Sequence, residues 1–201
     1  MSSDPRPHDA APGADGEPPV PLGLTVVVAQ LDVSDAEDVL RSLAGRLLDA
    51  GAVTVDFPEA LRTREQQYPT GLPTPIPTAI PHADPEHVLV PGLAIATLAR
   101  PVAFGEMGGT GGTVDARLVA MPLLTDARAH LAALQSLMGL LRDEAAVQDL
   151  LGAADEDELR ERTMTHLSGG AVGPGESADG NAADVGAADD TTTDDSKERE
   201  A

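Results

Sequence analysis

The chain contains five histidines, the side chains best suited to proton and group transfer near neutral pH: His8, His82, His87, His130 and His166. His82 stands out because Pro81 fixes the backbone directly before it, and the same proline pushes Ile80 into an extended conformation. An imidazole held in a rigid, ordered loop is a candidate nucleophile or acid–base group. On position alone, a structurally buried histidine is an equal alternative.

Two further side chains could complete an anion site around His82. His130 is expected near the start of a helix capped by Thr125 or Asp126, where free backbone N–H groups and the helix dipole favour a bound anion. Arg64 offers a planar guanidinium that fits phosphate or carboxylate oxygens. Taken singly, each also fits an ordinary role, a helix-face histidine and an arginine paired with a nearby carboxylate.

The other histidines favour no reacting role. His8 lies in the N-terminal arm, His166 closes the last expected helix, and His87 stands in a polar turn before a strand. The glycine-rich run 105–112 lacks the terminal lysine of a phosphate-binding P-loop, so we interpret it as a hairpin or edge loop.

The composition excludes several classes of function. The 34 acidic residues outnumber the 13 Lys and Arg, for a formal net charge of −21, and no basic stripe could replace the counterions of nucleic acid. No apolar run approaches the ~20 residues that cross a bilayer, and no secretory segment opens the chain. We therefore expect a cytoplasmic protein without direct membrane insertion. The absence of cysteine excludes disulfides, thiolate metal ligands and cysteine nucleophiles.

The balance of charged residues favours a salt-rich cytoplasm. Lys197 is the single lysine of the chain, and the excess of acid extends into the expected folded part. Salt screens such charges over a few ångströms, and acidic side chains keep a protein soluble there. A genome of high GC content is the alternative, but it explains the acidity less well.

The pattern of elements predicts an α/β fold, a mixed β-sheet flanked by helices in a single domain over residues 22–168. Apolar, β-branched runs predict strands at 24–29, at 92–98 and within 114–124. Helices are expected after the capping box Ser34–Glu37 and at 58–66, 125–142, 143–151 and 155–167. Residues 68–85 contain six prolines in 18 positions, which exclude a helix or a central strand and predict an ordered loop.

The two ends of the chain are expected to be disordered. Residues 1–21 and 169–201 are rich in small residues, proline and acids and show no apolar period. Neither segment can bury enough apolar surface to offset its ordering entropy. They are interpreted as an N-terminal arm and an acidic C-terminal tail.

Five short motifs occur in one order along the chain: Arg64-Glu65, Tyr68-Pro69-Thr70-Gly71-Leu72, Ala79-Ile80-Pro81-His82, Phe104-x-x-Met107-Gly108 and His130-Leu131-x-x-Leu134. This series resembles the IIA component of the phosphoenolpyruvate-dependent sugar phosphotransferase system, in its mannitol/fructose superfamily. The second and fourth motifs are most similar to the galactitol-type branch. The resemblance covers about residues 22–167 and implies a mixed sheet flanked by helices.

The resemblance also implies a chemistry. His82 would accept a phosphoryl group from the phosphohistidine of the carrier protein HPr and pass it to a cysteine of a IIB protein, which serves a IIC membrane permease. His130 would contact the phosphate, and Arg64 would help to neutralise its charge. The resemblance requires no metal and no organic cofactor.

Three functions remain open at this point. The first is a phosphohistidine carrier for uptake of a hexitol such as galactitol, or of a fructose-type sugar. The second is a regulatory protein of the same fold whose phosphorylation state controls a binding partner. The third is a metal-dependent hydrolase, because the spacing of residues 82–87 could offer metal ligands, with the set His82, Asp84, His87 and His130.

Overall fold

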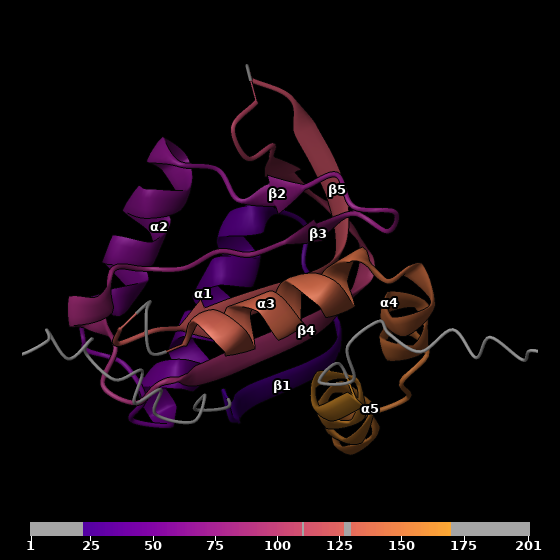
Figure 1. The fold of residues 1–201 in the computed structure, drawn as a ribbon. Helices are drawn as coiled ribbons and strands as arrows, with labels where there is room; N and C mark the ends of the chain where they lie inside the picture. Colours follow the sequence, from indigo (N-terminus) through magenta and orange to yellow (C-terminus); the bar gives the residue numbers. More distant parts are fainter. Residues whose placement is uncertain (1–21, 110, 127–129, 170–201) are drawn as a thin grey trace, which may run out of the picture.

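The computed structural model describes residues 22–109, 111–126 and 130–169 (Figure 1). At its centre is a five-stranded sheet in the order β1-β4-β5-β3-β2. The strands are β1 (Leu24–Leu31), β2 (Gly71–Leu72), β3 (Thr78–Ala79), β4 (Gly92–Gly105) and β5 (Thr113–Leu123). β1 runs parallel to β4 and β3 parallel to β5, while the pairs β4–β5 and β2–β3 are antiparallel. The sheet is therefore mixed, as expected.

Helices cover both faces of this sheet (Figure 1). They are α1 (Ala36–Asp49), α2 (Phe57–Gln67), α3 (Leu131–Arg142), α4 (Glu144–Leu151) and α5 (Glu156–Gly169), with a 3₁₀ helix η1 (Pro85–His87). α1 and α2 pack on one face, and α3, α4 and α5 pack on the other. Within the described ranges, no helix is both long enough and apolar enough to cross a bilayer.

The two faces of the sheet bury two separate apolar cores because successive strand residues point to opposite sides. In β1, Val26 and Val28 join the core under α1 and α2, whereas Val27 joins the core under α3 to α5. The same alternation separates Ile95 from Ala94 in β4. This arrangement confirms the expected α/β fold of a sheet between helices.

The proline-rich segment 68–85 is not a loop throughout, and the expectation of no central strand there is wrong. It contributes β2 and β3, and β3 lies between β5 and β2 inside the sheet. Thr78 and Ala79 supply the paired positions of β3. Pro77 contributes its carbonyl, which accepts from the Arg117 N–H at 2.9 Å. The prolines therefore lie where the sheet needs no N–H donor.

The connection between β4 and β5 is shorter than expected, because β4 continues to Gly105 instead of ending at Leu98. The register with β5 shifts between Thr97 and Val102, and the exposed Pro101 lies in that irregularity. A bulge accommodates a residue without an N–H, so the strand continues past the proline.

Two helix starts differ from the expected ones. Asp35 caps α1 in place of Ser34, and its Oδ1 accepts from the Asp38 N–H at 2.9 Å. α3 begins at Leu131 with His130 as N-cap, so neither Thr125 nor Asp126 caps it. The Asp126 carbonyl accepts from the His130 ring instead. The expected terminal arms, residues 1–21 and the chain beyond Gly169, lie outside the described residues.

Candidate functional site

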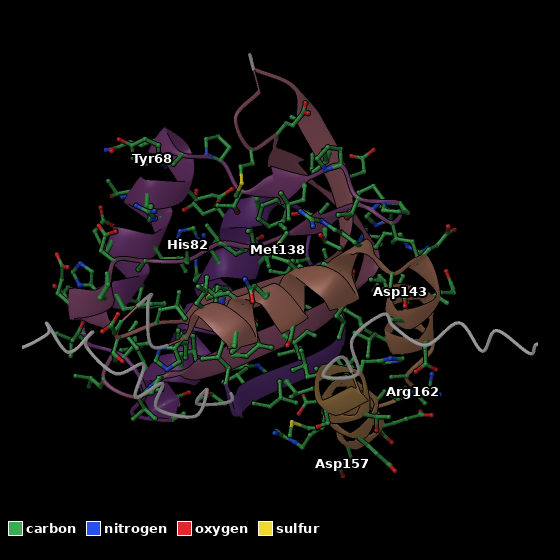
Figure 2. The ribbon with its side chains drawn as sticks, in the orientation of Figure 1. Tyr68, His82, Met138, Asp143, Asp157 and Arg162 are labelled. Atoms are coloured by element: carbon green, nitrogen blue, oxygen red, sulfur yellow. The ribbon has the colours of Figure 1, made fainter. Side chains whose placement is uncertain are left out.

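The backbone around His82 is fixed from both sides of the sheet. His82 follows β3 by three residues, and the Ile80 N–H donates to the Thr70 carbonyl at 3.2 Å. Ile80 packs against the core under α3 to α5, whereas Ala83 belongs to the core under α1 and α2. The imidazole is therefore presented by a segment that is anchored immediately before and after it. Figure 2 labels His82 among the side chains of the domain.

The hydrogen bonds of His82 assign its tautomer. Nδ1 lies 3.0 Å from the Ile80 carbonyl oxygen, and a carbonyl can only accept, so Nδ1 carries the proton. Nε2 lies 3.0 Å from Arg64 Nη2, which can only donate. Nε2 consequently holds the lone pair. Nε2 is therefore the nucleophilic nitrogen of this ring.

Arg64 lies in the last turn of α2, and its guanidinium contacts three groups. Nη2 donates to His82, Nη1 donates to Asp84 Oδ1 at 3.1 Å, and the guanidinium carbon lies 5.6 Å from the centre of the Tyr68 ring. Among the described residues, the Nε–H of Arg64 is buried without a hydrogen-bond partner. The cation is thus held beside the nucleophile with a buried donor unused.

Glu65, next to Arg64, fixes the turn that follows α2. Its Oε1 accepts from the Thr70 N–H at 3.0 Å and its Oε2 from the Thr70 hydroxyl at 2.6 Å. Burial raises the pKa of the Glu65 carboxyl, while the Thr70 hydrogen bonds and the nearby His82 act in the opposite direction. Sequence reasoning missed this structural role, although the adjacency of Arg64 and Glu65 in one motif is a signal for it.

His130 is buried, 4% exposed, at the N-terminus of α3. Its Nδ1 donates to the Asp126 carbonyl at 2.8 Å, and its Nε2 has no hydrogen-bond partner within the described part of the chain. β3 and β5 are paired and parallel, so the segments that follow them, with His82 and His130, both leave the sheet at the carboxyl ends of these strands. Among the described residues, no hydrogen bond joins His130 to His82 or Arg64.

Arg64 and His130 each carry a buried nitrogen without a hydrogen-bond partner among the described residues. In the part of the chain that the structure describes, the buried side-chain nitrogens and oxygens without a hydrogen bond are Arg64 Nε and His130 Nε2. Such atoms are rare in folded proteins, and each of them needs a physical explanation. An anion with several acceptor oxygens would satisfy the Arg64 donor, and the His130 nitrogen when it is protonated.

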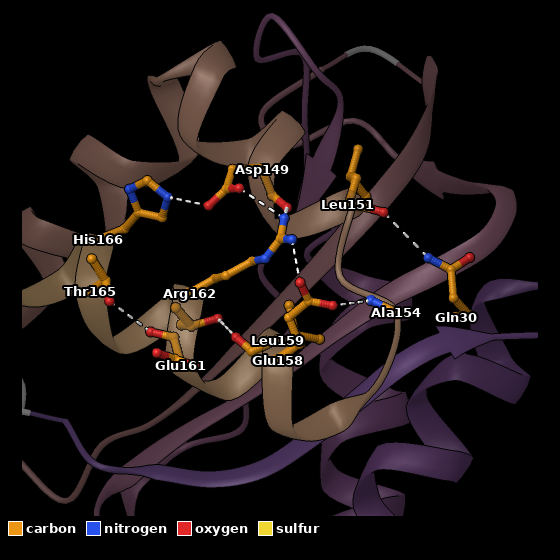
Figure 3. Close-up of polar contacts among 11 residues, drawn as sticks. Gln30, Asp149, Leu151, Ala154, Glu158, Leu159, Glu161, Arg162, Thr165 and His166 are labelled. Carbon is orange, nitrogen blue, oxygen red and sulfur yellow. Dashed lines mark hydrogen bonds and ion pairs between the residues drawn. The ribbon is translucent and has the colours of Figure 1, made fainter.

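The metal-site alternative gains no support from the geometry. His87 Nδ1 lies 3.4 Å from Asp56 Oδ2, and His82 contacts Arg64. No group of three or more His, Asp or Glu side chains within the described ranges could hold a metal ion. His166 lies in a separate network, where it contacts Asp149 at 2.9 Å (Figure 3).

The glycines of two motifs pack against each other rather than against a ligand. A Cβ on Gly71 would lie 2.5 Å from Val114 Cγ2 and 2.6 Å from the Gly105 carbonyl oxygen. The Met107 N–H donates to the Gly71 carbonyl at 2.8 Å. The hairpin that joins β4 and β5 is thereby fixed to β2, the edge strand beside β3.

Residues 22–163 match the protein family described as "Phosphoenolpyruvate-dependent sugar phosphotransferase system, EIIA 2". The chain is also similar to the multiphosphoryl transfer protein of Salmonella typhi, at 30% identity over 133 residues. This similarity covers 66% of the present chain and 34% of that protein. The chain thus spans about a third of the length of that relative.

Solved structures have the same fold. The mannitol enzyme IIA of Escherichia coli, determined in complex with phosphorylated enzyme IIB, is 25% identical with a TM-score of 0.58, covering 74% of this chain and 97% of that chain. The nitrogen regulatory protein IIA-Ntr of Neisseria meningitidis is 21% identical with a TM-score of 0.51, covering 69% and 92%.

Proposed function

Because the chain belongs to the EIIA 2 family of the phosphoenolpyruvate-dependent sugar phosphotransferase system, we propose that it carries a phosphoryl group between two partner proteins on His82 Nε2. The domains of this family carry phosphoryl groups between proteins. What is proposed for this chain is the accepting atom, the supporting residues and the partners.

The transfer uses the lone pair that the tautomer leaves on Nε2. Nε2 attacks the phosphorus of a phosphohistidine on the donor, a new N–P bond forms, and the donor N–P bond breaks with its electron pair returning to the donor ring. No proton has to leave His82, because the attacking nitrogen carries none. The Nδ1–H remains hydrogen-bonded to the Ile80 carbonyl oxygen, and this bond keeps the ring in place during the reaction.

The charge of the transferred group is stabilised by donors that are already in position. As the N–P bond forms, the hydrogen bond from Arg64 Nη2 to the Nε2 lone pair is lost, and Nη2 donates to phosphoryl oxygens instead. The unpartnered Nε–H of Arg64 donates to the same group. His130, in its protonated form, donates from Nε2, and the N-terminus of α3 adds its dipole. Phosphoryl transfer requires chiefly such positioning and charge stabilisation.

One observation supports this assignment above the others: the buried, unpartnered Arg64 Nε and His130 Nε2 are on the residues expected to bind the phosphate. The test is phosphorylation from phosphoenolpyruvate through enzyme I and HPr in concentrated KCl, followed by intact-mass analysis. We expect the wild type and the control His87→Ala to gain one phosphoryl group, and His82→Ala to gain none. A His82→Ala variant that is phosphorylated like the wild type would contradict the proposal.

We further infer the partners and setting. HPr is the proposed donor, and the proposed acceptor is the cysteine of a IIB protein that works with a IIC permease, in the cytoplasm. The similarity of the PTGL and F-x-x-M-G stretches to the galactitol-type branch supports a hexitol, with fructose as the other candidate. The acid-rich, lysine-poor composition supports a halophilic source.

A regulatory role is the second candidate. It is favoured by the shared fold with the nitrogen regulatory protein of Neisseria meningitidis. The two roles differ in where the phosphoryl group goes: a transport protein loses it rapidly to a IIB protein from the same genome, whereas a regulator retains it. Mixing the phosphorylated chain with that IIB protein and following its mass over time distinguishes them.

A further inference from the structure

The carboxylate of Asp84 shares the Arg64 guanidinium with the reacting nitrogen. Asp84 stands two residues after His82, and its Oδ1 accepts from Arg64 Nη1 at 3.1 Å. On the other side of the same guanidinium, Nη2 donates to His82 Nε2 at 3.0 Å. One cation therefore joins an anion to the nucleophile.

We propose that Asp84 is a positioning residue that competes with the phosphoryl group for Arg64 and so sets how readily phosphorylated His82 passes its group on. This inference rests on the function proposed above. It adds a residue outside the three expected from the sequence, and it concerns the equilibrium of the transfer rather than the identity of the nucleophile.

The competition follows from the single positive charge of Arg64. Before transfer, Nη1 donates to Asp84 and Nη2 donates to the lone pair of Nε2. Once the N–P bond forms, that lone pair is used, and the phosphoryl oxygens require the same cation. Two anions then share one guanidinium, and each reduces the stabilisation that the other receives. The phosphorylated state is consequently less stable with Asp84 present than with a neutral residue there.

The exposure of the pair limits the size of the effect. The side chain of Asp84 is 58% exposed and that of Arg64 30% exposed, so solvent screens part of the interaction. Exposed ion pairs contribute up to about 1 kcal/mol, which corresponds to a change of about fivefold in an equilibrium constant. We expect the competition to shift the transfer equilibrium by about two- to fivefold, a size suited to adjusting a reversible step without blocking it.

The test is the equilibrium between phosphorylated HPr and the chain. Purified phospho-HPr, freed of enzyme I and phosphoenolpyruvate, is mixed with wild type or Asp84→Asn, and the phosphorylated fraction of each protein is read by intact mass. Asparagine keeps an oxygen that can accept from Nη1 while removing the charge. The matched control is Asp32→Asn, which removes the same charge from an exposed pair with Arg100, a residue outside the site.

The proposal requires Asp84→Asn to raise the equilibrium constant toward the phosphorylated chain by about two- to fivefold, with Asp32→Asn close to the wild type. An unchanged or lowered constant, with the wild type phosphorylated on His82, would overturn the role of Asp84 and leave the proposed function standing. Absence of phosphorylation in every protein would overturn both.

A second comparison separates an effect through Arg64 from direct repulsion. In an Arg64→Gln background there is no guanidinium to share, so the substitution Asp84→Asn should change the equilibrium much less than it does beside Arg64. If the full effect persists in that background, Asp84 acts on the phosphoryl group directly, and its assignment as a residue that works through Arg64 is wrong.

Discussion

Replacing Gly71 by alanine tests whether β2 and the β4–β5 hairpin are as closely packed as the structure shows. The added methyl would lie 2.5 Å from Val114 Cγ2 and 2.6 Å from the Gly105 carbonyl oxygen. Non-bonded carbon atoms normally lie about 3.5–4.0 Å apart, so the contact with Val114 is too short by about 1 Å. The contact with the carbonyl oxygen is also shorter than the 3.0 Å below which real Cβ atoms are essentially never found. One of the two partners is backbone, which cannot move aside alone.

The expected loss of stability follows from these contacts. Forcing a methyl into a filled site typically costs about 1–3 kcal/mol, through shifts of side chains and backbone. Alanine also lowers the conformational entropy of the unfolded chain, and this effect offsets about 0.4–1 kcal/mol of the loss. We expect Gly71→Ala to lower the free energy of unfolding by about 1–2 kcal/mol, measured by urea denaturation with far-ultraviolet circular dichroism, since the chain has no tryptophan.

The matched control is Gly45→Ala. Gly45 lies within α1, where an added Cβ meets nothing within 4 Å. In such a helical position alanine is more favourable than glycine by about 1 kcal/mol, so this variant should gain stability. If Gly71→Ala unfolds at the same urea concentration as the wild type, or if both variants lose stability equally, the packing argument is refuted.

Three further predictions concern other parts of the fold. Asp143→Ala removes the carboxylate that accepts from two backbone N–H groups at the start of α4, and should lower the free energy of unfolding by about 1 kcal/mol; an unchanged urea midpoint would contradict the cap. Phe57→Ala empties a fully buried site under α1 and α2 and should cost about 3–5 kcal/mol, where a loss below about 1 kcal/mol would show that the site collapses. Burial raises the pKa of Glu65 in the folded protein above its value in the unfolded chain. The stability that protonated Glu65 contributes is therefore fully present below the unfolded-state pKa, and it is lost as the pH rises through the folded-state pKa. Because glutamine cannot ionise, the stability of Glu65→Gln relative to the wild type should increase from about pH 4 to about pH 7; a decrease would reverse the sign of the argument.

Much of the fold could be predicted because its signals are local. Apolar runs predicted β1, the first half of β4 and most of β5, and the helices α1, α2, α4 and α5 lie close to their expected positions. The resemblance drawn from five short motifs is confirmed at the level of the family. β2 and β3 were missed because two paired residues between prolines are too few to form a pattern.

The site could be predicted by residue type but not by contact. The sequence suggested His82 and Arg64 as members of one anion site, and the structure brings Arg64 Nη2 to 3.0 Å from His82 Nε2. It could not assign the free lone pair to Nε2, because that depends on the Ile80 carbonyl, whose direction is set by the packing around β3. The sequence likewise could not predict that His130 is the N-cap of α3 rather than a residue inside the helix, because several nearby polar residues could fill the capping position.

The prolines that precede His82 have a consequence for the unfolded chain. Each proline at a compatible backbone position removes conformations that the unfolded chain could otherwise sample, and is worth about 0.4–1 kcal/mol. With five such residues between positions 68 and 82, the segment that presents the nucleophile loses comparatively little freedom when it becomes ordered. The proline rings therefore already restrict the backbone that holds the reacting imidazole before the chain folds. The short strand β3, with only two paired residues, is then sufficient to fix the position of this segment.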